Sequence, residues 1–532
     1  MSRFSIPEVT TDPAIDMSLD TIKIGKQALV FCNTRRSSEA TAEKIAKEIK
    51  TNSEELDELN NQILKVLSTP TKQCRRLAMC VRRGTAFHHA GLAAGQRKIV
   101  ENGFKIGLIK IICSTPTLAM GINLPAFRTI IKDLKRYGGR WGLQYIPTLE
   151  YHQMAGRAGR PDFNDKFGQA ICIAKTESDA EEILERFIYA DPENIYSKLA
   201  VEPVLRTYCL SLIATGFANS YESLINFFEK TFYGYQYGDM AKLGGIIQKI
   251  LELLEEWEFI RYKEQKEAKQ QDNRMGDFVS ATNYNAVDTK KIEVTKIGAR
   301  VAQLYLDPYT AFFIITSLRR ATQKVTNEFS YLQMALSTIE LRPLSTVRVK
   351  EVEYVESEIN ERESFLITYM PSVFESEYDD FLKSIKTTIA LESWMDESTE
   401  DNLLDLFNIT PGELHYKKNL VDWILYSANE MATLLSFNDL IKMIRKTRFR
   451  LDKGIKEELI PLARLKKIGR ARARKLFNNG IKDLGDIKKA DITKLKQLLG
   501  EKLALDVKKQ VGEEVEVVKK GKRKGQLGLG KY

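Results

Sequence analysis

The first third of the chain alternates short apolar runs with amphipathic segments. The apolar runs lie at residues 27–32 (QALVFC), 109–113 (IKIIC) and 169–174 (QAICIA), and helical patterns such as that of residues 38–49 separate them. Short buried runs that alternate with helices are typical of parallel strands joined by crossover helices. The pattern therefore predicts an α/β lobe built on a parallel sheet.

The pattern changes after about residue 195, where strand-like runs nearly disappear. Long amphipathic segments follow, so we expect the rest of the chain to be mostly helical. At 532 residues the chain is also too long for one core, which predicts several domains. The helical part is interrupted by breaker residues at Asp307-Pro308, Pro371, Pro411-Gly412 and Gly454.

Composition narrows the class of protein. Apolar residues make up 43% and charged residues 29% of the chain, an ordinary globular balance. No apolar stretch approaches the roughly 20 residues of a membrane span, and Asp12, Asp16 and Asp20 argue against a signal peptide. We expect a soluble, cytoplasmic protein that does not bind a membrane. The six cysteines are scattered and have no histidines at zinc spacing, so no metal site is predicted.

Positive charge is concentrated near the C-terminus. Residues 461–489 hold ten Lys or Arg against Asp483 and Asp486 alone. Such a cluster favours a polyanionic partner, although a solvated helix surface explains such runs equally well.

The most specific motif is Gln153-Met-Ala-Gly-Arg157-Ala-Gly-Arg160. We expect it at the start of a helix, with both arginines on one helical face, where their forked donors suit phosphate oxygens. The string resembles motif VI of superfamily-two helicases. The resemblance implies that Arg157 and Arg160 are arginine fingers for ATP held on another RecA-like lobe, and that Gln153 helps to sense the nucleotide.

A Ser/Thr/Gly-rich segment precedes this motif. Residues 114–126 follow the predicted strand at 109–113 and resemble helicase motif V. A segment of this kind is by itself more often a plain loop, but its position one strand before motif VI favours motif V. The resemblance implies nucleic-acid phosphate contacts and contacts with nucleotide; the former fall on Ser114, Thr115 and Thr117, the latter on Gly121 and Asn123.

Two further segments complete the lobe. Residues 31–37 (FCNTRRS) resemble motif IV, a strand that ends in a polar turn at a helix start, and imply that Thr34 and Arg35 contact a DNA phosphate. The alternative for Arg35 is a solvated helix start. Residues 87–92 (FHHAGL) match a segment that the same family carries, in which His88 and His89 are expected to be structural or hinge residues.

Together these motifs resemble the archaeal Holliday-junction-migration (Hjm) DNA repair helicases, relatives of the helicase part of polymerase theta. The likeness runs from about residue 27 to residue 489. It implies a multidomain α/β plus α architecture with 1–26 as an N-terminal extension, 27–200 as the second RecA-like lobe, 201–306 as a winged-helix domain, 307–450 as a helical ratchet domain, 451–505 as a helix-hairpin-helix domain and 506–532 as a basic flexible tail.

The resemblance also implies DNA contacts outside the lobe motifs. A strand-separating β-hairpin is expected within residues 128–150; its tip would hold Tyr137, Arg140 and Trp141, unless the hairpin is only an exposed turn. On the ratchet helix, Trp423 is expected to stack on a base, although a tryptophan at helical spacing is ordinarily core. Tyr416 stands about where the family has arginine.

The C-terminal region resembles nucleic-acid and partner-binding modules. Gly469 and the nearby Arg470, Arg472 and Arg474 resemble a helix-hairpin-helix that grips phosphates, although Lys467 replaces a usual glycine. The last residues resemble a sliding-clamp-binding motif, with a generic basic tail as the alternative. The implied clamp contacts are Gln526, Leu529 and Tyr532.

The sequence contains neither a G-x-x-x-x-G-K-[ST] string nor an Asp-Glu-x-His box. ATP and Mg²⁺ are therefore expected to be held mainly by a lobe that these residues do not supply. One hypothesis is a C-terminal subunit or fragment of an ATP-dependent 3′–5′ DNA helicase, acting in repair on single-stranded, forked or branched DNA with a separate Walker-motif polypeptide. The alternatives are a non-catalytic DNA-binding scaffold, a truncated helicase, or part of an RNA helicase.

Overall fold

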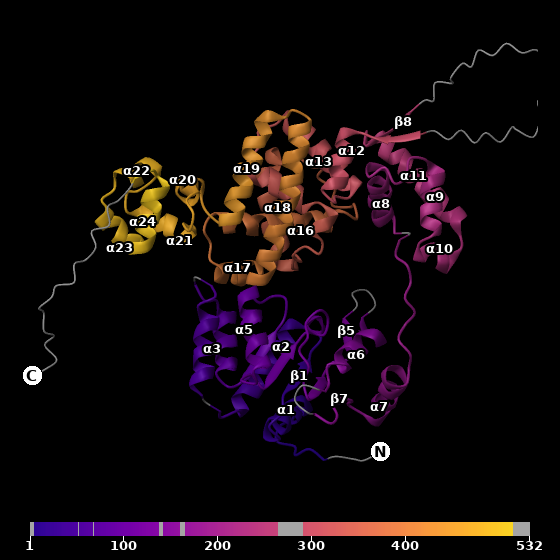
Figure 1. The fold of residues 1–532 in the computed structure, drawn as a ribbon, viewed down its shortest axis with the longest axis vertical. Coiled ribbons are helices and arrows are strands. Elements are labelled where there is room, and N and C mark those ends of the chain that lie inside the picture. The colour runs from indigo at the N-terminus through magenta and orange to yellow at the C-terminus, as the bar shows by residue number, and fades with distance from the viewer. Residues whose placement is uncertain are drawn as a thin grey trace, which may run out of the picture.

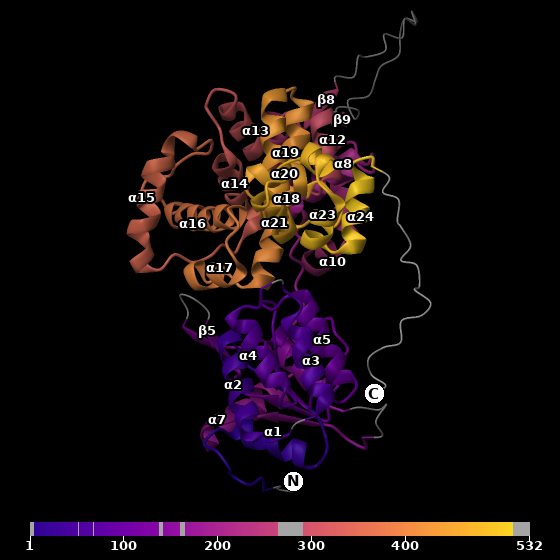
Figure 2. The same cartoon turned by 90° about the vertical axis from the view of Figure 1, so that its left-hand side faces the viewer.

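The structure is a computed structural model that describes residues 5–51, 53–67, 69–137, 142–159, 165–199, 201–263 and 291–513. A parallel-sheet lobe lies on one side of the molecule and a group of helical domains on the other (Figure 1). The C-terminal helices form a compact end unit beside the long helices α18 and α19 (Figures 1 and 2).

The lobe is built on a five-stranded sheet of order β2-β3-β1-β4-β7 in which all neighbouring strands are parallel. Strands β1, β2, β3 and β4 are buried along their length, as expected where helices cover both faces of a sheet. The predicted parallel α/β lobe is confirmed. The strands are β1 (Ala28–Phe31), β2 (Thr85–His88), β3 (Ile111–Ser114), β4 (Arg128–Ile131) and β7 (Gln169–Cys172).

One strand replaces part of the expected hairpin. Residues Arg128–Ile131 form β4 in the centre of the sheet, because the run Thr129-Ile130-Ile131 is apolar enough to be buried on both faces. The hairpin itself is shorter and pairs β5 (Lys135–Tyr137) with β6 (Leu143–Tyr145) in antiparallel register.

We predicted that residues 1–26 are an N-terminal extension. Instead, helix α1 within this range belongs to the lobe. Helix α1 (Pro13–Lys23) begins at a proline capped by Asp12, and its Ala14 and Ile15 lie in the core of the lobe. Its Asp20 also accepts from Arg128 Nη1 of β4 at 2.9 Å. Burial and this ion pair fix α1 against the sheet.

The next domain combines helices with a two-stranded ribbon. Strands β8 (Ile260–Lys263) and β9 (Lys291–Val294) pair antiparallel after four helices, and the assignment of a winged helix stays a prediction. The helices are α8 (Glu202–Ala214), α9 (Tyr221–Glu229), α10 (Phe232–Tyr237), α11 (Met240–Glu256) and α12 (Lys296–Gln303).

A helical domain follows, and its apolar core is continuous with that of the preceding domain. Its longest element is α18 (Pro411–Leu434), which packs against α13, α14 and α19. The other helices are α13 (Pro308–Ala321), α14 (Glu328–Leu336), α15 (Val352–Arg362), α16 (Tyr378–Met395), α17 (Glu400–Phe407) and α19 (Asn438–Lys453).

The C-terminal unit has its own small core. Helix α24 (Glu501–Gln510) crosses the predicted boundary at residue 505, because Ala504 and Val507 are buried on the same side of it. The preceding helices are α20 (Ile460–Ala463), α21 (Arg470–Asn478), α22 (Leu484–Lys489) and α23 (Ile492–Leu499). Within the described parts of the chain, no helix combines the length and apolar character that a membrane crossing needs.

Candidate nucleotide and nucleic-acid site

The motif VI arginines follow a helix instead of starting one. Helix α6 (Thr148–Ala155) carries Gln153 in its last turn and ends at Gly156, so Arg157 lies in the turn beyond it. Gly159, at φ +101°, keeps this turn out of a helix. The prediction that Arg157 lies on a helical face is therefore wrong. Arg160 lies outside the described residues.

Motifs V and VI are joined through Arg157. Its Nε donates to the Ala119 carbonyl at 3.1 Å, and its Nη2 donates to the same oxygen. The backbones also pair, with the Ala126 amide donating to the Arg157 carbonyl at 2.9 Å and the Gly159 amide to the Ala126 carbonyl at 2.7 Å. The turn that carries the proposed finger is thus fixed on the end of motif V.

The same region holds the other residues of the predicted nucleotide site. The Gln153 Oε1 atom is buried and has no hydrogen-bond partner among the described residues; as an acceptor, it suits an N–H or O–H donor and not a phosphate oxygen. Gly121, at φ +85°, has open space where a side chain would project, and Asn123 is exposed nearby in the chain. Guanidinium and amide groups suit a terminal phosphate. The described residues contain no His, Cys, Asp and Glu cluster that could hold a metal ion, so Mg²⁺ would need other ligands.

The predicted DNA-phosphate residues lie at the carboxyl ends of β1 and β3, which are neighbours in the sheet. Thr34 caps α2 (Arg35–Glu48) by accepting from the Ser37 amide at 3.1 Å. The Thr115 and Thr117 hydroxyls are 2.9 Å apart at the surface.

Two predicted phosphate contacts do not fit their surroundings. The Ser114 side chain is fully buried, so its hydroxyl does not face a DNA backbone. Arg35 is exposed in part, but its guanidinium forms an ion pair with Glu413 of α18. The prediction that these two residues bind a DNA phosphate is therefore corrected. Ser114 is a buried residue at the end of a strand, and Arg35 forms an ion pair between domains.

The base of the hairpin is fixed to its neighbours. Tyr137 is 76% exposed, whereas Arg140 and Trp141 lie outside the described residues. At the base, Asn33 Nδ2 donates to the Lys135 carbonyl at 2.8 Å and Arg136 pairs with Glu150 at 2.9 Å. The hairpin is thus attached both to motif IV and to α6. Asn33 and Glu150 were not among the predicted site residues, although Asn33 lies within motif IV.

The two histidines of the FHHAGL segment are structural. His89 Nε2 is 3.0 Å from Glu39 Oε1, and its Nδ1 accepts from the Gly91 amide at 3.1 Å. Burial alone would raise the pKa of Glu39, but hydrogen bonds from His89 and Gln73 and the charge of Arg76 lower it below its usual value. Burial lowers the pKa of His88, which pairs with Glu101 at 2.9 Å.

On helix α18 the side chains of the two predicted DNA contacts differ in their exposure. Tyr416 is 60% exposed. Trp423 packs partly against the shared core, and its Nε1 donates to the Leu304 carbonyl of the preceding domain at 3.1 Å. Its polar edge therefore has a structural partner, while the stacking role of its ring stays a prediction.

The turn of the helix-hairpin-helix has the backbone conformation that the sequence led us to expect. Gly469 caps α21 and has open space around it. Lys467 adopts φ +66°, the left-handed conformation that a glycine would take at lower cost. Arg472 is exposed, and its Nη1 donates only locally, to the Lys467 carbonyl at 2.8 Å.

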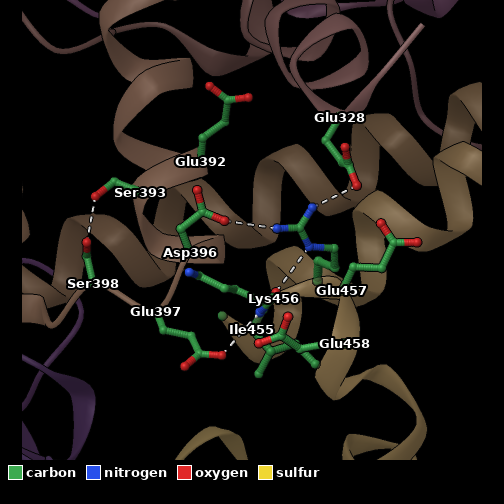
Figure 3. Close-up of polar contacts among 12 residues, drawn as sticks. Glu328, Glu392, Ser393, Asp396, Glu397, Ser398, Ile455, Lys456, Glu457 and Glu458 are labelled. Carbon is green, nitrogen blue, oxygen red and sulfur yellow. Dashed lines mark hydrogen bonds and ion pairs between the residues drawn. The ribbon is translucent and has the colours of Figure 1, made fainter. Parts of the chain in front are cut away.

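The other two arginines of this hairpin attach it to the ratchet domain. Arg474 forms a bidentate pair with Glu397 at 2.8 Å and contacts Glu458 at 2.8 Å. Arg470 donates to the Ser398 carbonyl at 2.9 Å and stacks on Trp394. Figure 3 shows the acidic groups that gather at this junction, Asp396 and Glu397 on one side and Glu457 and Glu458 on the other. The predicted phosphate contacts of Arg470 and Arg474 are therefore corrected to interdomain contacts.

The proposed clamp-binding residues Gln526, Leu529 and Tyr532 lie outside the described residues, so the clamp contact stays a prediction.

Comparison with known proteins assigns three regions of the chain. A profile for a helicase conserved C-terminal domain matches residues 13–162, which agrees with α1 being part of the lobe. A profile for domain 4 of archaeal helicases matches residues 329–454, and one for a SAM-like helix-hairpin-helix tandem matches residues 459–513.

Relatives extend the likeness to nearly the whole chain. The ATP-dependent DNA helicase Hel308 of Pyrococcus horikoshii is 37% identical over 520 residues, which is 96% of this chain and 67% of that protein. The proteins of the same name from Methanocella arvoryzae and Methanococcus vannielii are 35% and 36% identical, covering 95% and 91% of this chain. The chain spans 65% and 66% of those two relatives, slightly under two thirds of their length. The chain belongs to the Hel308 family.

Proposed function

We propose that this chain is the DNA-tracking part of an ATP-dependent 3′–5′ DNA helicase that acts on single-stranded, forked or branched repair intermediates. Its relatives are named as ATP-dependent DNA helicases. The observation that carries the proposal is the motif VI turn, where the Arg157 guanidinium is fixed on the Ala119 carbonyl of motif V. That arrangement is suited to a terminal phosphate presented by a second lobe with Walker motifs.

In this proposal the chain contributes positioned donors and DNA contacts. Bound ATP with Mg²⁺ would supply the free energy of phosphoryl transfer. Arg157 and Arg160 would stabilise the negative charge that develops on the transferred phosphoryl oxygens, a role worth about 10³- to 10⁵-fold in rate. The exposed Tyr137 would stand at the point of strand separation, and Thr34, Thr115 and Thr117 would hold the DNA backbone.

The test combines the full chain with a Walker-motif lobe of a Hel308 relative and measures DNA-stimulated ATP hydrolysis. We expect Arg157→Ala to lower turnover by about 10³-fold or more while DNA binding stays within about twofold. Lys166→Ala is the matched control, because this exposed cation lies near the same turn and has no proposed role.

Two results would contradict the proposal. Equal loss of DNA binding and turnover in Arg157→Ala would place Arg157 on DNA and not on ATP. An inactive mixture that still binds forked DNA would favour a non-catalytic scaffold.

A further inference from the structure

The first turn of the ratchet helix α18 fits tightly against the FHHAGL segment of the lobe. The Gly412 amide donates to the Gly91 carbonyl at 3.0 Å. A Cβ on Gly412 would lie 2.2 Å from the Ala90 carbonyl oxygen and 2.6 Å from that of Leu92. These are backbone atoms that cannot turn aside, so only glycine fits here. Glycine inside a helix costs about 1 kcal/mol relative to alanine, and the close interdomain contact accounts for it.

The next residue joins the two domains by charge. Glu413 Oε2 accepts from the Thr410 amide at 3.0 Å and from the Thr410 hydroxyl at 2.8 Å, which completes the capping box of α18. Its Oε1 pairs with Arg35 at the first position of α2. Burial would raise the pKa of Glu413, but the Thr410 amide and Arg35 lower it below its usual value. One ionised carboxylate therefore caps the ratchet helix and binds the lobe.

A second carboxylate repeats this arrangement at the neighbouring helix α17. Asp401 Oδ1 accepts from the Lys72 amide at 2.8 Å, at the first position of α4 (Lys72–Val81). Asp405 pairs with the Lys72 ammonium at 2.7 Å. Negative charge at a helix N-terminus is stabilising, so the start of α4 offers a site that the ratchet domain occupies.

The receiving loop of the lobe is itself fixed from behind. The buried His89 joins Gly91 to Glu39, and Glu39 Oε2 pairs with Arg76 of α4 at 2.6 Å. Displacement of these helices would therefore have to break the contacts of α18 with α2 and with the loop at residues 90–92, and those of α17 with α4.

We propose that Gly412 and Glu413 are positioning residues that fix α18 on the second lobe, so that the ratchet helix moves with the lobe that supplies the arginine fingers. Tyr416 lies one turn further along α18 and would be carried by the same movement. This inference rests on the proposed helicase function for its motor step, whereas the docking itself is a property of the chain alone.

The docking is tested on the full chain without ATP, by hydrogen exchange of the segments around residues 90–92 and 411–414. Gly412→Ala should raise exchange in both segments by about tenfold or more, while the strands of the sheet stay protected. Gly245→Ala is the matched control, since Gly245 lies in helix α11 with open space at its Cβ position and should leave both segments unchanged. Unchanged protection in Gly412→Ala would overturn the docking.

Glu413→Gln provides a second variant should Gly412→Ala fold poorly. Its amide oxygen can still accept from Thr410, but it lacks the charge that pairs with Arg35. We expect increased hydrogen exchange at residues 90–92, while the first turn of α18 remains helical. Unchanged hydrogen exchange in this variant would show that the ion pair between Arg35 and Glu413 does not contribute to the docking.

The coupling is tested with a Walker-motif lobe present, as base pairs separated per ATP hydrolysed. Gly412→Ala should lower this ratio by about 10- to 100-fold, because a misplacement of about 1 Å can cost that much, while DNA-stimulated hydrolysis stays within about twofold. An unchanged ratio in a variant whose docking has opened would overturn the positioning role. Absence of hydrolysis with the unaltered chain would instead count against the proposed function, and the exchange experiment would still decide the docking.

Discussion

Glu392 of α16 has a carboxyl group whose pKa is affected in opposite directions by burial and by a nearby arginine. Burial raises its pKa to about 7, even though Arg362 of α15 pairs with it and acts to lower the pKa. Arg362 also pairs with Glu358 at 2.7 Å, and its guanidinium lies 5.4 Å from the centre of the Phe329 ring. The arginine therefore keeps partners when Glu392 is neutral, which allows the carboxyl group to be protonated near neutral pH.

This environment predicts a pH-dependent stability. The unfolded carboxyl loses its proton near pH 4.3, whereas the folded one keeps it until about pH 7. The folded state binds more protons between these values, so the free energy of unfolding should fall as pH rises through this window. Glu392→Gln should remove a fall on the order of 1–3 kcal/mol between pH 5 and pH 8.

The measurement is urea unfolding of the helical domains at pH 5, 6, 7 and 8. Glu353→Gln, on the exposed side of α15, serves as the control and should keep the slope of the unaltered chain. A Glu392→Gln variant with that same slope would show that Glu392 is ionised throughout the range.

Arg472 and Arg474 lie in one basic run but have different roles in the structure, and the sequence could predict only their charge. Arg472 remains exposed, whereas Arg474 meets Glu397, which lies 77 residues earlier in the chain. A long-range partner of this kind leaves no local pattern. Lys467 was recognisable as a substitute for glycine, and its positive φ agrees with that observation.

At the scale of elements, helix α21 carries one arginine that is expected to contact DNA, Arg472, and one that attaches the helix to another domain, Arg474. Arg472→Ala should reduce the slope of log affinity against log salt by about 0.7 to 0.9, the effect of one lost phosphate contact. Arg474→Ala should leave that slope unchanged, because Arg474 already neutralises Glu397 and Glu458. Fluorescence anisotropy of labelled single-stranded and duplex DNA from 50 to 300 mM salt measures both slopes.

A second readout distinguishes the two arginines further. Arg474→Ala should raise hydrogen exchange around residues 455–458, where its ion pairs join the C-terminal unit to the ratchet domain, and Arg472→Ala should not. Equal losses of salt slope in the two variants would mean that Arg474 leaves its carboxylates to bind DNA.

The elements that could be predicted are those with a local signal. Apolar runs located β1, β3 and β7, and the strand-to-helix turn of motif IV was found as expected. The boundaries of α1 and α24 depend on which apolar side chains a distant core covers, and that information is not local. Pro411 and Gly412 were recognised only as breaker residues, whereas the structure places them in the first turn of α18, with Gly412 against the lobe.

At the scale of the whole molecule, the distribution of cores divides the chain into cooperative units. The lobe has one core and the C-terminal unit another, whereas one apolar cluster extends from Leu205 of α8 to Leu451 of α19. The helices from α8 to α19 that share this cluster should therefore unfold together. The lobe has a core of its own that shares no residue with that cluster, so the lobe is expected to unfold as a separate unit.

A buried ion pair lies at the centre of the shared unit. Arg206 of α8 forms two hydrogen bonds of 2.8 Å with Asp307, the residue that caps α13, and both side chains are almost fully buried. The Arg206 guanidinium also lies 5.8 Å from the centre of the Trp257 ring and 5.5 Å from that of the Tyr309 ring. Removing one partner leaves the other charge buried and unpaired, which costs about 3–5 kcal/mol.

Arg206→Ala should therefore lower the melting temperature of the shared unit by roughly 6–20 °C, since each kcal/mol shifts a unit of this size by about 2–4 °C. The transition of the lobe should not move, because the pair makes no contact with the lobe's core. Differential scanning calorimetry of the full chain resolves the two transitions, and Arg261→Ala, which breaks an exposed pair with Glu293, is the control with an expected shift near zero. If Arg206→Ala moved both transitions together, the lobe and the helical domains would form a single cooperative unit, and the division by cores would be wrong.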